Sequence, residues 1–222
     1  MLNLEIRHTP TKTAKASKSV EFMPGVELPA FGMQFERDSE IFGEGEPADF
    51  AYKVVSGVVR TLRLLDDGRR QISAFYFPGD IFGVESGEEH ANSAEAVTVS
   101  EVALVRQSTL LKRTGESCAA ACELWAATSR ELKRARSHLV LLGRQTAAER
   151  VANFLLQMSD HQNGSESVCL PMSRTDIADY LGLTIETVSR TLSQMERKGA
   201  IALLNCKQIE LRNRSALECS EL

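Results

Sequence analysis

Hydrophobic and polar positions change their spacing along the chain, and the changes mark regions with different predicted structures. Residues 1–25 are mostly polar and rich in Lys, Thr and Ser, so we expect a loosely ordered arm. Beyond it, short β-branched and aromatic runs are separated by glycines, and Gly57, Gly68 and Gly79 lie eleven residues apart. This spacing predicts an all-β sandwich or barrel with antiparallel meander pairing and a hairpin turn at Asp67-Gly68.

From about residue 109 glycine becomes rare and helix-forming residues dominate. Positions with alternating spacings of three and four form a heptad stripe: Cys118, Ala121, Trp125, Thr128, Leu132, Ala135, Leu139 and Leu142. A narrow stripe on a mostly charged helix is typical of a two-stranded seam, so we predict a homodimer through this helix. Packing of the helix against its own barrel is the alternative, and both can hold at once.

The C-terminal third has the pattern of two short helices followed by two strands. Ser173 and Thr184 are suited to cap the helices, and Asp176 occupies the capping-box position of the first. Gly182 can supply the positive φ that a tight turn between the helices requires. Strands are expected at 168–171, 201–204 and 208–211, the last two as a wing. The small core is predicted to comprise Ile177, Ala178, Leu181, Leu183, Val188 and Leu192.

A winged helix-turn-helix presents the first turn of its second helix to the major groove of DNA. Four side chains are predicted to read bases there: Ile185, Glu186, Ser189 and Arg190. Arginine can donate twice to guanine O6 and N7, and glutamate can accept from cytosine N4. A plain surface ion pair between Glu186 and Arg190 is the alternative. Arg174 and Thr187 are predicted to contact phosphate, which adds affinity without sequence information.

These patterns predict an α+β chain with four parts. They are a flexible arm (1–25), a β-barrel (26–115), a dimerisation helix (116–143) and a winged helix-turn-helix (144–222). The formal net charge of −4 does not decide the partner, because a local basic patch suffices for DNA binding. No long apolar run and no secretory pattern is present, so we expect a cytoplasmic protein without membrane association.

The segment Thr184–Arg190 resembles the recognition helix of the CRP/FNR superfamily of transcription regulators. Residues 55–60, 78–83 and 101–103 resemble the cyclic-nucleotide-type barrel of that family, a double-stranded β-helix. The Glu-x-x-Ser-Arg pattern is similar to the FNR branch and, within it, to the FixK group. The resemblance implies an activator of microaerobic respiration or nitrogen-fixation genes that binds a TTGAT-N4-ATCAA-like palindrome.

The same resemblance implies a contact with RNA polymerase through an acidic hairpin turn, which here contains Asp66 and Asp67. An ordinary solvated turn is the alternative. Members of the family that bind cyclic AMP hold its phosphate with a Gly-Glu-Leu helix and a following Arg-Ser pair. This chain has Gly83-Val84-Glu85 and then Asn92-Ser93, so a buried phosphate would lack its cation. We therefore predict a barrel that binds no cyclic nucleotide.

No other cofactor and no metal is predicted. No cysteine precedes Cys118, so a four-thiolate iron–sulfur cluster is not expected, and Cys118 with Cys122 lacks further ligands. The five cysteines show no Cys-x-x-Cys, which argues against a disulfide framework. Cys169 and Cys206 are expected to be buried as small hydrophobes, and His90 to be a solvated loop histidine.

The residue pattern offers no constellation for acyl or phosphoryl transfer, so an enzyme is not predicted. Two alternatives remain open: a sensory module that does not bind DNA, and a small-molecule-gated regulator with an unidentified barrel ligand. Control by abundance, by proteolysis or by cysteine oxidation also remains open.

Overall fold

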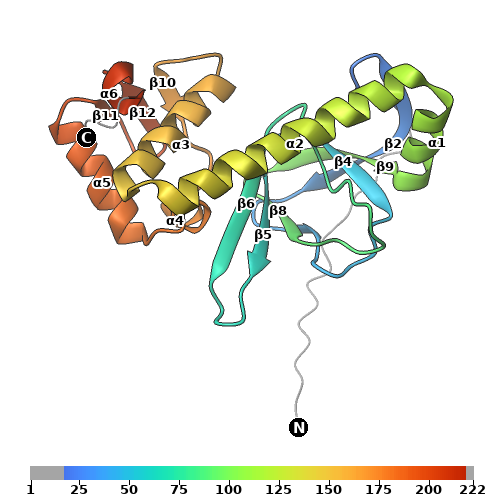
Figure 1. Ribbon diagram of the computed structural model, residues 1–222, viewed down its shortest axis with the longest axis horizontal. Helices are drawn as coiled ribbons and strands as arrows, with labels where there is room; N and C mark the ends of the chain where they lie inside the picture. The colour runs from blue at the N-terminus through green and yellow to red at the C-terminus, as the bar shows by residue number, and fades with distance from the viewer. Residues whose placement is uncertain (1–17, 219–222) are drawn as a thin grey trace, which may run out of the picture. The chain divides into compact units, whose positions relative to one another are not determined.

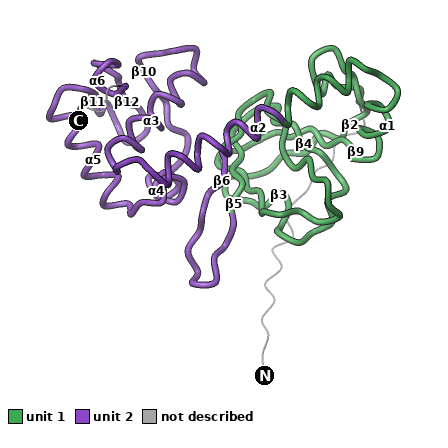
Figure 2. Tube along the Cα trace, viewed as in Figure 1, with its two compact units in different colours: residues 1–62, 75–128 green, residues 63–74, 129–222 purple. Residues whose placement is uncertain are grey.

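The computed structural model describes residues 18–218, which divide into two compact units (Figure 2). The first unit holds residues 18–62 and 75–128, and the second holds 63–74 and 129–218. No helix in this described part of the chain is long and apolar enough to span a membrane.

The strands and helices follow the order shown in Figure 1. The strands are β1 (Lys18–Met23), β2 (Val26–Phe35), β3 (Glu40–Phe42), β4 (Phe50–Ser56), β5 (Val59–Leu64), β6 (Arg70–Tyr76), β7 (Ile81–Phe82), β8 (Ser93–Ala96), β9 (Ser100–Arg106), β10 (Ser167–Cys169), β11 (Ile201–Leu203) and β12 (Gln208–Leu211). The helices are α1 (Gln107–Glu116), α2 (Cys118–Arg144), α3 (Ala147–His161), α4 (Arg174–Leu181), α5 (Ile185–Arg197) and α6 (Arg214–Glu218).

The N-terminal strands form two sheets, one in the order β1-β2-β9-β4-β7 and one in the order β3-β8-β5-β6. The predicted antiparallel pairing is confirmed, but the predicted meander is wrong, because β2 pairs with β9 and β5 with β8. At several points the chain passes from one sheet to the other between successive strands, as between β4 and β5. Gly57 makes that step with φ of +83°, and an added Cβ there would collide with the side chain of Ser100.

One core cluster of the first unit lies on one face of the five-stranded sheet. Alternate residues in the first half of β2, namely Val26, Leu28 and Ala30, point inward, as a strand with one covered face requires. These residues share a hydrophobic cluster with Leu110 of α1 and Ala120 of α2. Phe22 and Met23 of β1 are also buried in this cluster. The expected loose arm is therefore wrong for residues 18–25, and its remaining part, 1–17, lies outside the described residues.

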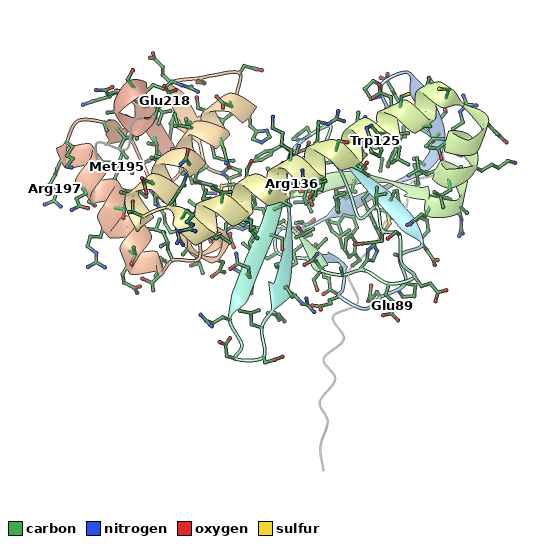
Figure 3. The ribbon with its side chains drawn as sticks, viewed as in Figure 1. Glu89, Trp125, Arg136, Met195, Arg197 and Glu218 are labelled. Carbon is green, nitrogen blue, oxygen red and sulfur yellow. The ribbon has the colours of Figure 1, made fainter. Side chains whose placement is uncertain are left out.

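Helix α2 has two different stripes. One stripe is covered by other residues of the same chain: Ala120 and Leu141 are buried, and Leu124 packs against the core cluster. The other is the predicted heptad stripe, in which Trp125 is 75% exposed (Figure 3), Leu132 is 51% exposed and Leu139 is 75% exposed. The alternative that the helix packs against its own barrel holds at the start of the helix, where Ala120 and Leu124 join the core cluster, and it leaves the heptad stripe uncovered.

The second unit contains the predicted two helices and wing. Strands β11 and β12 pair antiparallel and β10 joins them on the other edge of β12. The predicted core residues Ile177, Ala178, Leu181, Val188 and Leu192 are all at most 3% exposed, whereas Leu183 is only partly buried. A helix-turn-helix with its own small core is therefore present.

Candidate nucleic-acid interface

Helix α4 begins with the predicted capping box. The Ser173 hydroxyl accepts from the backbone N–H of Asp176 at 3.0 Å, and the Asp176 carboxylate accepts from the Ser173 N–H at 3.0 Å. Two N–H groups that the helix cannot pair internally are thereby satisfied. The start of the first helix is fixed by its local sequence.

The turn between the two helices depends on a glycine. Gly182 has φ of +61°, in the left-handed region, and its N–H donates to the carbonyl of Ala178. The N–H of Leu183 donates to the same carbonyl at 3.0 Å. A Cβ at position 182 would also lie 3.2 Å from Cδ2 of Leu142. This close approach and the positive φ together explain why glycine is present.

Helix α5 exposes the four predicted base-reading side chains on one face. Thr184 caps the helix, accepting from the backbone N–H of Thr187 at 3.2 Å, as predicted. Along the helix, the inward positions are Val188, Thr191, Leu192 and Met195, all buried. The outward positions of the first turns are Ile185 (41% exposed), Glu186, Ser189 and Arg190. The sharp division between the faces leaves the polar face available to a partner.

The first turn of α5 carries a negative charge that local groups stabilise. Hydrogen bonds from its own backbone N–H and from the Thr184 hydroxyl hold the pKa of Glu186 below its usual value, and the charge of Arg190 adds to the effect. The anion lies at a helix N-terminus, where the helix dipole also favours it. Glu186 is therefore ionised at neutral pH and can accept a hydrogen bond from a base.

The two predicted phosphate contacts are less exposed than the base-reading residues. Arg174 is half-buried, and its Nη1 has no hydrogen-bond partner within the described part of the chain. Burial holds the pKa of Arg174 below its usual value, but the group remains cationic. Thr187 is partly buried, with its hydroxyl 3.1 Å from that of Thr184. A contact with phosphate requires the Arg174 side chain to reach outward.

The two cysteines near this domain do not behave as predicted. Cys169 ends β10, and Cys206 lies in the turn between β11 and β12; both are exposed rather than buried. Their backbone positions on the edge of a small sheet and at a wing turn keep them out of the core.

Comparisons with known proteins decide the family. A model of the cyclic nucleotide-binding domain matches residues 33–114, and a model of the Crp-like helix-turn-helix domain matches residues 149–220. The nitrogen fixation regulation protein FixK of Azorhizobium caulinodans is 52% identical over 188 residues, covering 82% of this chain and 76% of the relative. The chain belongs to the CRP/FNR family of transcription regulators.

Two further relatives agree with this assignment. FixK of Rhizobium meliloti is 42% identical over 178 residues, which cover 80% of this chain and 81% of the relative. The solved structure of FixK2 from Bradyrhizobium japonicum is 50% identical, with a TM-score of 0.83 over 86% of this chain and 97% of that chain. The predicted fold, a barrel-type domain, a long helix and a C-terminal helix-turn-helix, is thereby confirmed.

In this CRP/FNR chain the segment that resembles a phosphate site, residues 83–93, contains no lysine or arginine. Val84 packs against the core cluster. The buried guanidinium of Arg60 is bound by the carboxylates of Glu95 at 2.6 Å and Asp38 at 3.2 Å. Asn92 is only partly exposed. Among the described residues no group of three or more His, Cys, Asp or Glu side chains is placed to hold a metal.

His90 is not the solvated residue that the sequence suggested. It is 2% exposed, and its ring stacks on Phe42 with centroids 3.7 Å apart. Its backbone carbonyl accepts from the N–H of Gly45 and its N–H donates to the carbonyl of Glu46, both at 2.9 Å, which joins its loop to the loop between β3 and β4. Burial lowers the pKa of His90, despite the Glu85 carboxylate 3.8 Å away. The histidine is therefore a neutral core residue.

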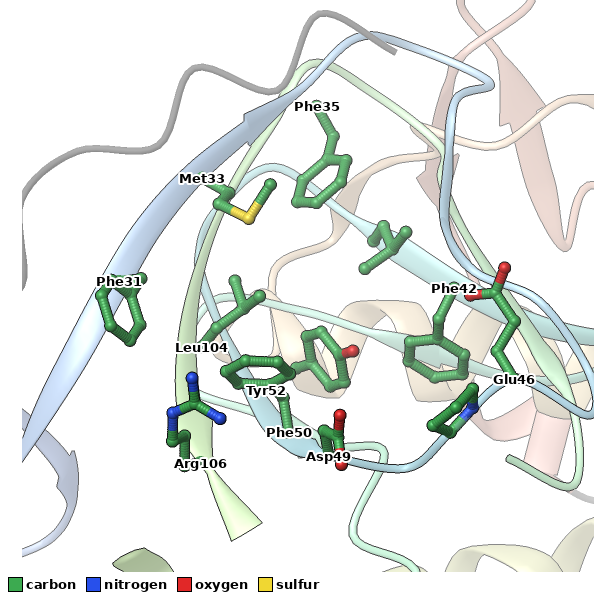
Figure 4. Close-up of a pocket in the computed structure, with 12 residues that line it drawn as sticks. Phe31, Met33, Phe35, Phe42, Glu46, Asp49, Phe50, Tyr52, Leu104 and Arg106 are labelled. Atoms are coloured by element: carbon green, nitrogen blue, oxygen red, sulfur yellow. The ribbon is translucent and has the colours of Figure 1, made fainter. Parts of the chain in front are cut away.

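A cavity of about 440 Å³ lies in the first unit (Figure 4). Its lining comes from β2, β3, β4, β9 and the loop before β4, and it includes Phe31, Met33, Phe50 and Leu104. Arg106 lies at its edge, with the guanidinium 5.4 Å from the centre of the Phe50 ring. Burial, with the nearby carboxylates of Glu46 and Asp49, raises the pKa of Tyr52 in this wall to about 12.

Proposed function

We propose that this chain is a homodimeric activator that reads a TTGAT-N4-ATCAA-like palindrome and controls microaerobic respiration or nitrogen-fixation genes. The observation that carries the proposal is the exposed polar face on the first turns of α5, in a helix-turn-helix with its own core. The names of the FixK relatives support the class of target genes. Its place of action would be the cytoplasm, where its DNA lies.

The exposed heptad stripe of α2 supports the homodimer. Apolar groups that lie uncovered at heptad spacing gain free energy when a second copy covers them. The proposed seam is formed by Ala121, Trp125, Thr128, Leu132, Ala135, Leu139 and Leu142. Leu142 is the exception to the exposure, because it is partly buried beside Gly182. A two-fold dimer matches the symmetry of a palindrome, with half-sites about one helical turn or roughly 34 Å apart.

Each side chain of the reading face has a proposed role. Arg190 donates to guanine, Glu186 accepts from cytosine N4, and Ser189 and Ile185 face thymines through hydroxyl and methyl contacts. Arg174 and Thr187 contact phosphate. By function, residues 26–115 form the effector-type barrel, 116–143 the dimerisation helix and 144–222 the DNA-binding domain.

The hairpin turn between β5 and β6 is the proposed contact with RNA polymerase. Asp66 and Asp67 are both exposed there. The Asp67 carboxylate is held 2.7 Å from Nη2 of Arg69, which lowers its pKa and keeps it charged. An exposed and fixed negative charge is suited to a basic protein surface.

The barrel acts without a cyclic nucleotide in this proposal, since Asn92 stands where the resemblance expects the phosphate-binding arginine and residues 83–93 contain no lysine or arginine. The cavity in the first unit favours a second candidate, a regulator gated by another small molecule. Its volume of about 440 Å³ lies within the range of small-molecule sites, and its lining is mostly apolar, as in such sites.

The test is a fluorescence anisotropy titration of purified full-length protein in buffer free of nucleotides. The labelled duplex carries the palindrome, and the control duplex has both half-sites scrambled. We expect the palindrome to bind on the order of 1,000-fold more tightly than the control. Equal binding of the two duplexes would contradict the proposal. A strict requirement for an added small molecule would instead favour the gated regulator.

A further inference from the structure

The C-terminal end of α4 is held by side chains from three other elements of the same compact unit. The last carbonyls of a helix have no partner within it. Here the carbonyl of Asp179 accepts from Nε2 of Gln71 at 2.9 Å, and that of Tyr180 accepts from Nε2 of His138 at 2.8 Å. The carbonyl of Leu181 accepts from Nη1 of Arg150 at 2.9 Å. Three successive carbonyls are thus paired outside the helix.

An ion pair strengthens the link to the hairpin. Nη2 of Arg70 lies 2.9 Å from Oδ1 of Asp176 and 2.8 Å from Oδ2 of Asp179, and its Nε donates to Asp179 at 3.0 Å. The side chains are mostly shielded, with exposures of 26% for Arg70 and 5% for Asp176. Charge-assisted hydrogen bonds in such a setting are stronger and more directional than exposed pairs.

The link to α2 combines a ring stack with the hydrogen bond. The rings of His138 and Tyr180 are nearly parallel, at an angle of 11°, with centroids 4.2 Å apart. His138 lies on the stretch of α2 that also carries Leu132 and Leu139 of the proposed seam. The end of α4 is therefore tied to the helix on which a second copy would dock.

The anchored end of α4 lies immediately before the turn into α5. Only Gly182, Leu183 and Thr184 separate α4 from α5, and the turn has a fixed left-handed conformation at Gly182. A cavity of about 760 Å³ lies between the hairpin and the two helices, and Thr184 and Thr187 line it. The four base-reading side chains lie outside that lining. The anchor can hold α5 while leaving its reading face open.

We propose that Arg70 and His138 are positioning residues for DNA reading, which hold α4 so that the two recognition helices of a dimer keep the separation of the palindrome. For its DNA readout the inference rests on the proposed function. It gives the hairpin a second role beside the proposed polymerase contact. Neither residue touches a base; both act through α4.

The first test measures spacer preference with the full-length chain. Duplexes with three, four and five base pairs between half-sites are titrated against wild type and Arg70→Met. We expect Arg70→Met to weaken binding to the four-base-pair spacer about 10-fold and to reduce the discrimination against the other spacers. Discrimination at single bases within a half-site and the salt dependence should stay unchanged. A protein that had merely lost stability would instead lose affinity for every duplex alike.

The matched control is Arg69→Met, which removes the same charge from the adjacent position of the hairpin. Arg69 pairs with Asp67 rather than with α4, so its loss should leave spacer preference unchanged. Arg70→Lys should restore part of the preference. Asp179→Asn should reproduce the defect, and its combination with Arg70→Met should cost no more than either change alone. Equal effects of Arg69→Met and Arg70→Met, or full additivity of the double variant, would overturn the proposal.

A second measurement needs no DNA and so separates this inference from the proposed function. Amide hydrogen exchange at Gly182 and Leu183 should accelerate in Arg70→Met and in His138→Phe, which keeps an aromatic ring but removes the donor. Exchange in α6, far along the chain, should not change. Unaltered exchange at the turn in both variants would show that the anchor does not hold α4, whether or not the wild type binds the palindrome.

Discussion

The two helices of the helix-turn-helix use their surfaces in opposite ways. Helix α4 is bound at both ends: its start is closed by a reciprocal capping box, and its final carbonyls are paired with the hairpin, α2 and α3. Helix α5 is bound only along its inner face, and Glu186, Ser189 and Arg190 lie exposed on the outer one. Beyond Arg174, the residues of α4 thus serve mainly structure, whereas those of α5 are divided between core and partner.

Sequence specificity and the placement of the helices therefore depend on different sets of side chains. A side chain that reads a base must keep a donor or an acceptor site available, because a site already used within the protein has to be released before DNA can use it. A side chain that positions a helix must be the reverse, well paired and shielded. Substitutions in α5 should therefore change which sequence is bound, and substitutions around α4 should change how two half-sites are combined.

The largest effect on DNA binding is expected from substitutions that separate the two copies of the chain, because each copy supplies one α5. Leu132→Glu together with Leu139→Glu places four carboxylates in the proposed seam of a dimer, where burial of unpaired charges is costly. The protein should sediment as a monomer. Its affinity for the palindrome should fall on the order of 100-fold or more, because two linked modules bind far more tightly than one.

Val140→Glu serves as the control for the seam. Val140 is 57% exposed, next to Leu139, but lies off the heptad stripe. This variant should remain a dimer with normal affinity. If the double variant still sediments as a dimer, the copies associate through another surface.

A smaller and uniform effect is expected from the phosphate contact at the start of α4. Arg174→Ala should weaken binding to all sequences alike and lower the slope of log affinity against log salt by about one unit per half-site. The measurement is a salt titration with matched and mismatched duplexes. A loss of discrimination at one base pair would assign Arg174 to base reading, and base reading would then not be confined to α5.

The smallest effect on DNA binding is expected at the hairpin turn. Asp66→Ala with Asp67→Ala should leave affinity for the palindrome intact, because both groups lie in a turn outside the reading face. Transcription in vitro with RNA polymerase should nevertheless decrease, as an acidic contact surface is lost. Unchanged transcription would identify the turn as an ordinary solvated one.

Local patterns predicted much of the fold and the reading face. Caps such as Ser173 and Thr184, the turn glycine Gly182 and the heptad stripe depend on residues a few positions apart, so the sequence shows them directly. The exposed position of Arg190 follows from the same helical spacing.

Contacts between residues far apart in the chain could not be predicted from the sequence. The non-sequential order of the strands, the burial of His90 and the ion pair of Arg70 with Asp179, 109 positions away, depend on how the chain returns to itself. No periodicity connects such residues. The predicted burial of Cys169 and Cys206 was wrong for a related reason. Whether they are buried depends on neighbours in a small sheet, and the sequence does not reveal the edges of that sheet.

The most direct test of the division between α5 and α4 is a binding profile over all single-base variants of one half-site. It is measured in parallel for wild type, Arg190→Ala and Arg70→Met. We expect Arg190→Ala to lose about 1–3 kcal/mol per half-site and to become indifferent at the G·C pair. Arg70→Met should bind more weakly with the wild-type profile. Full discrimination at the G·C pair in Arg190→Ala, or its loss in Arg70→Met, would contradict the account.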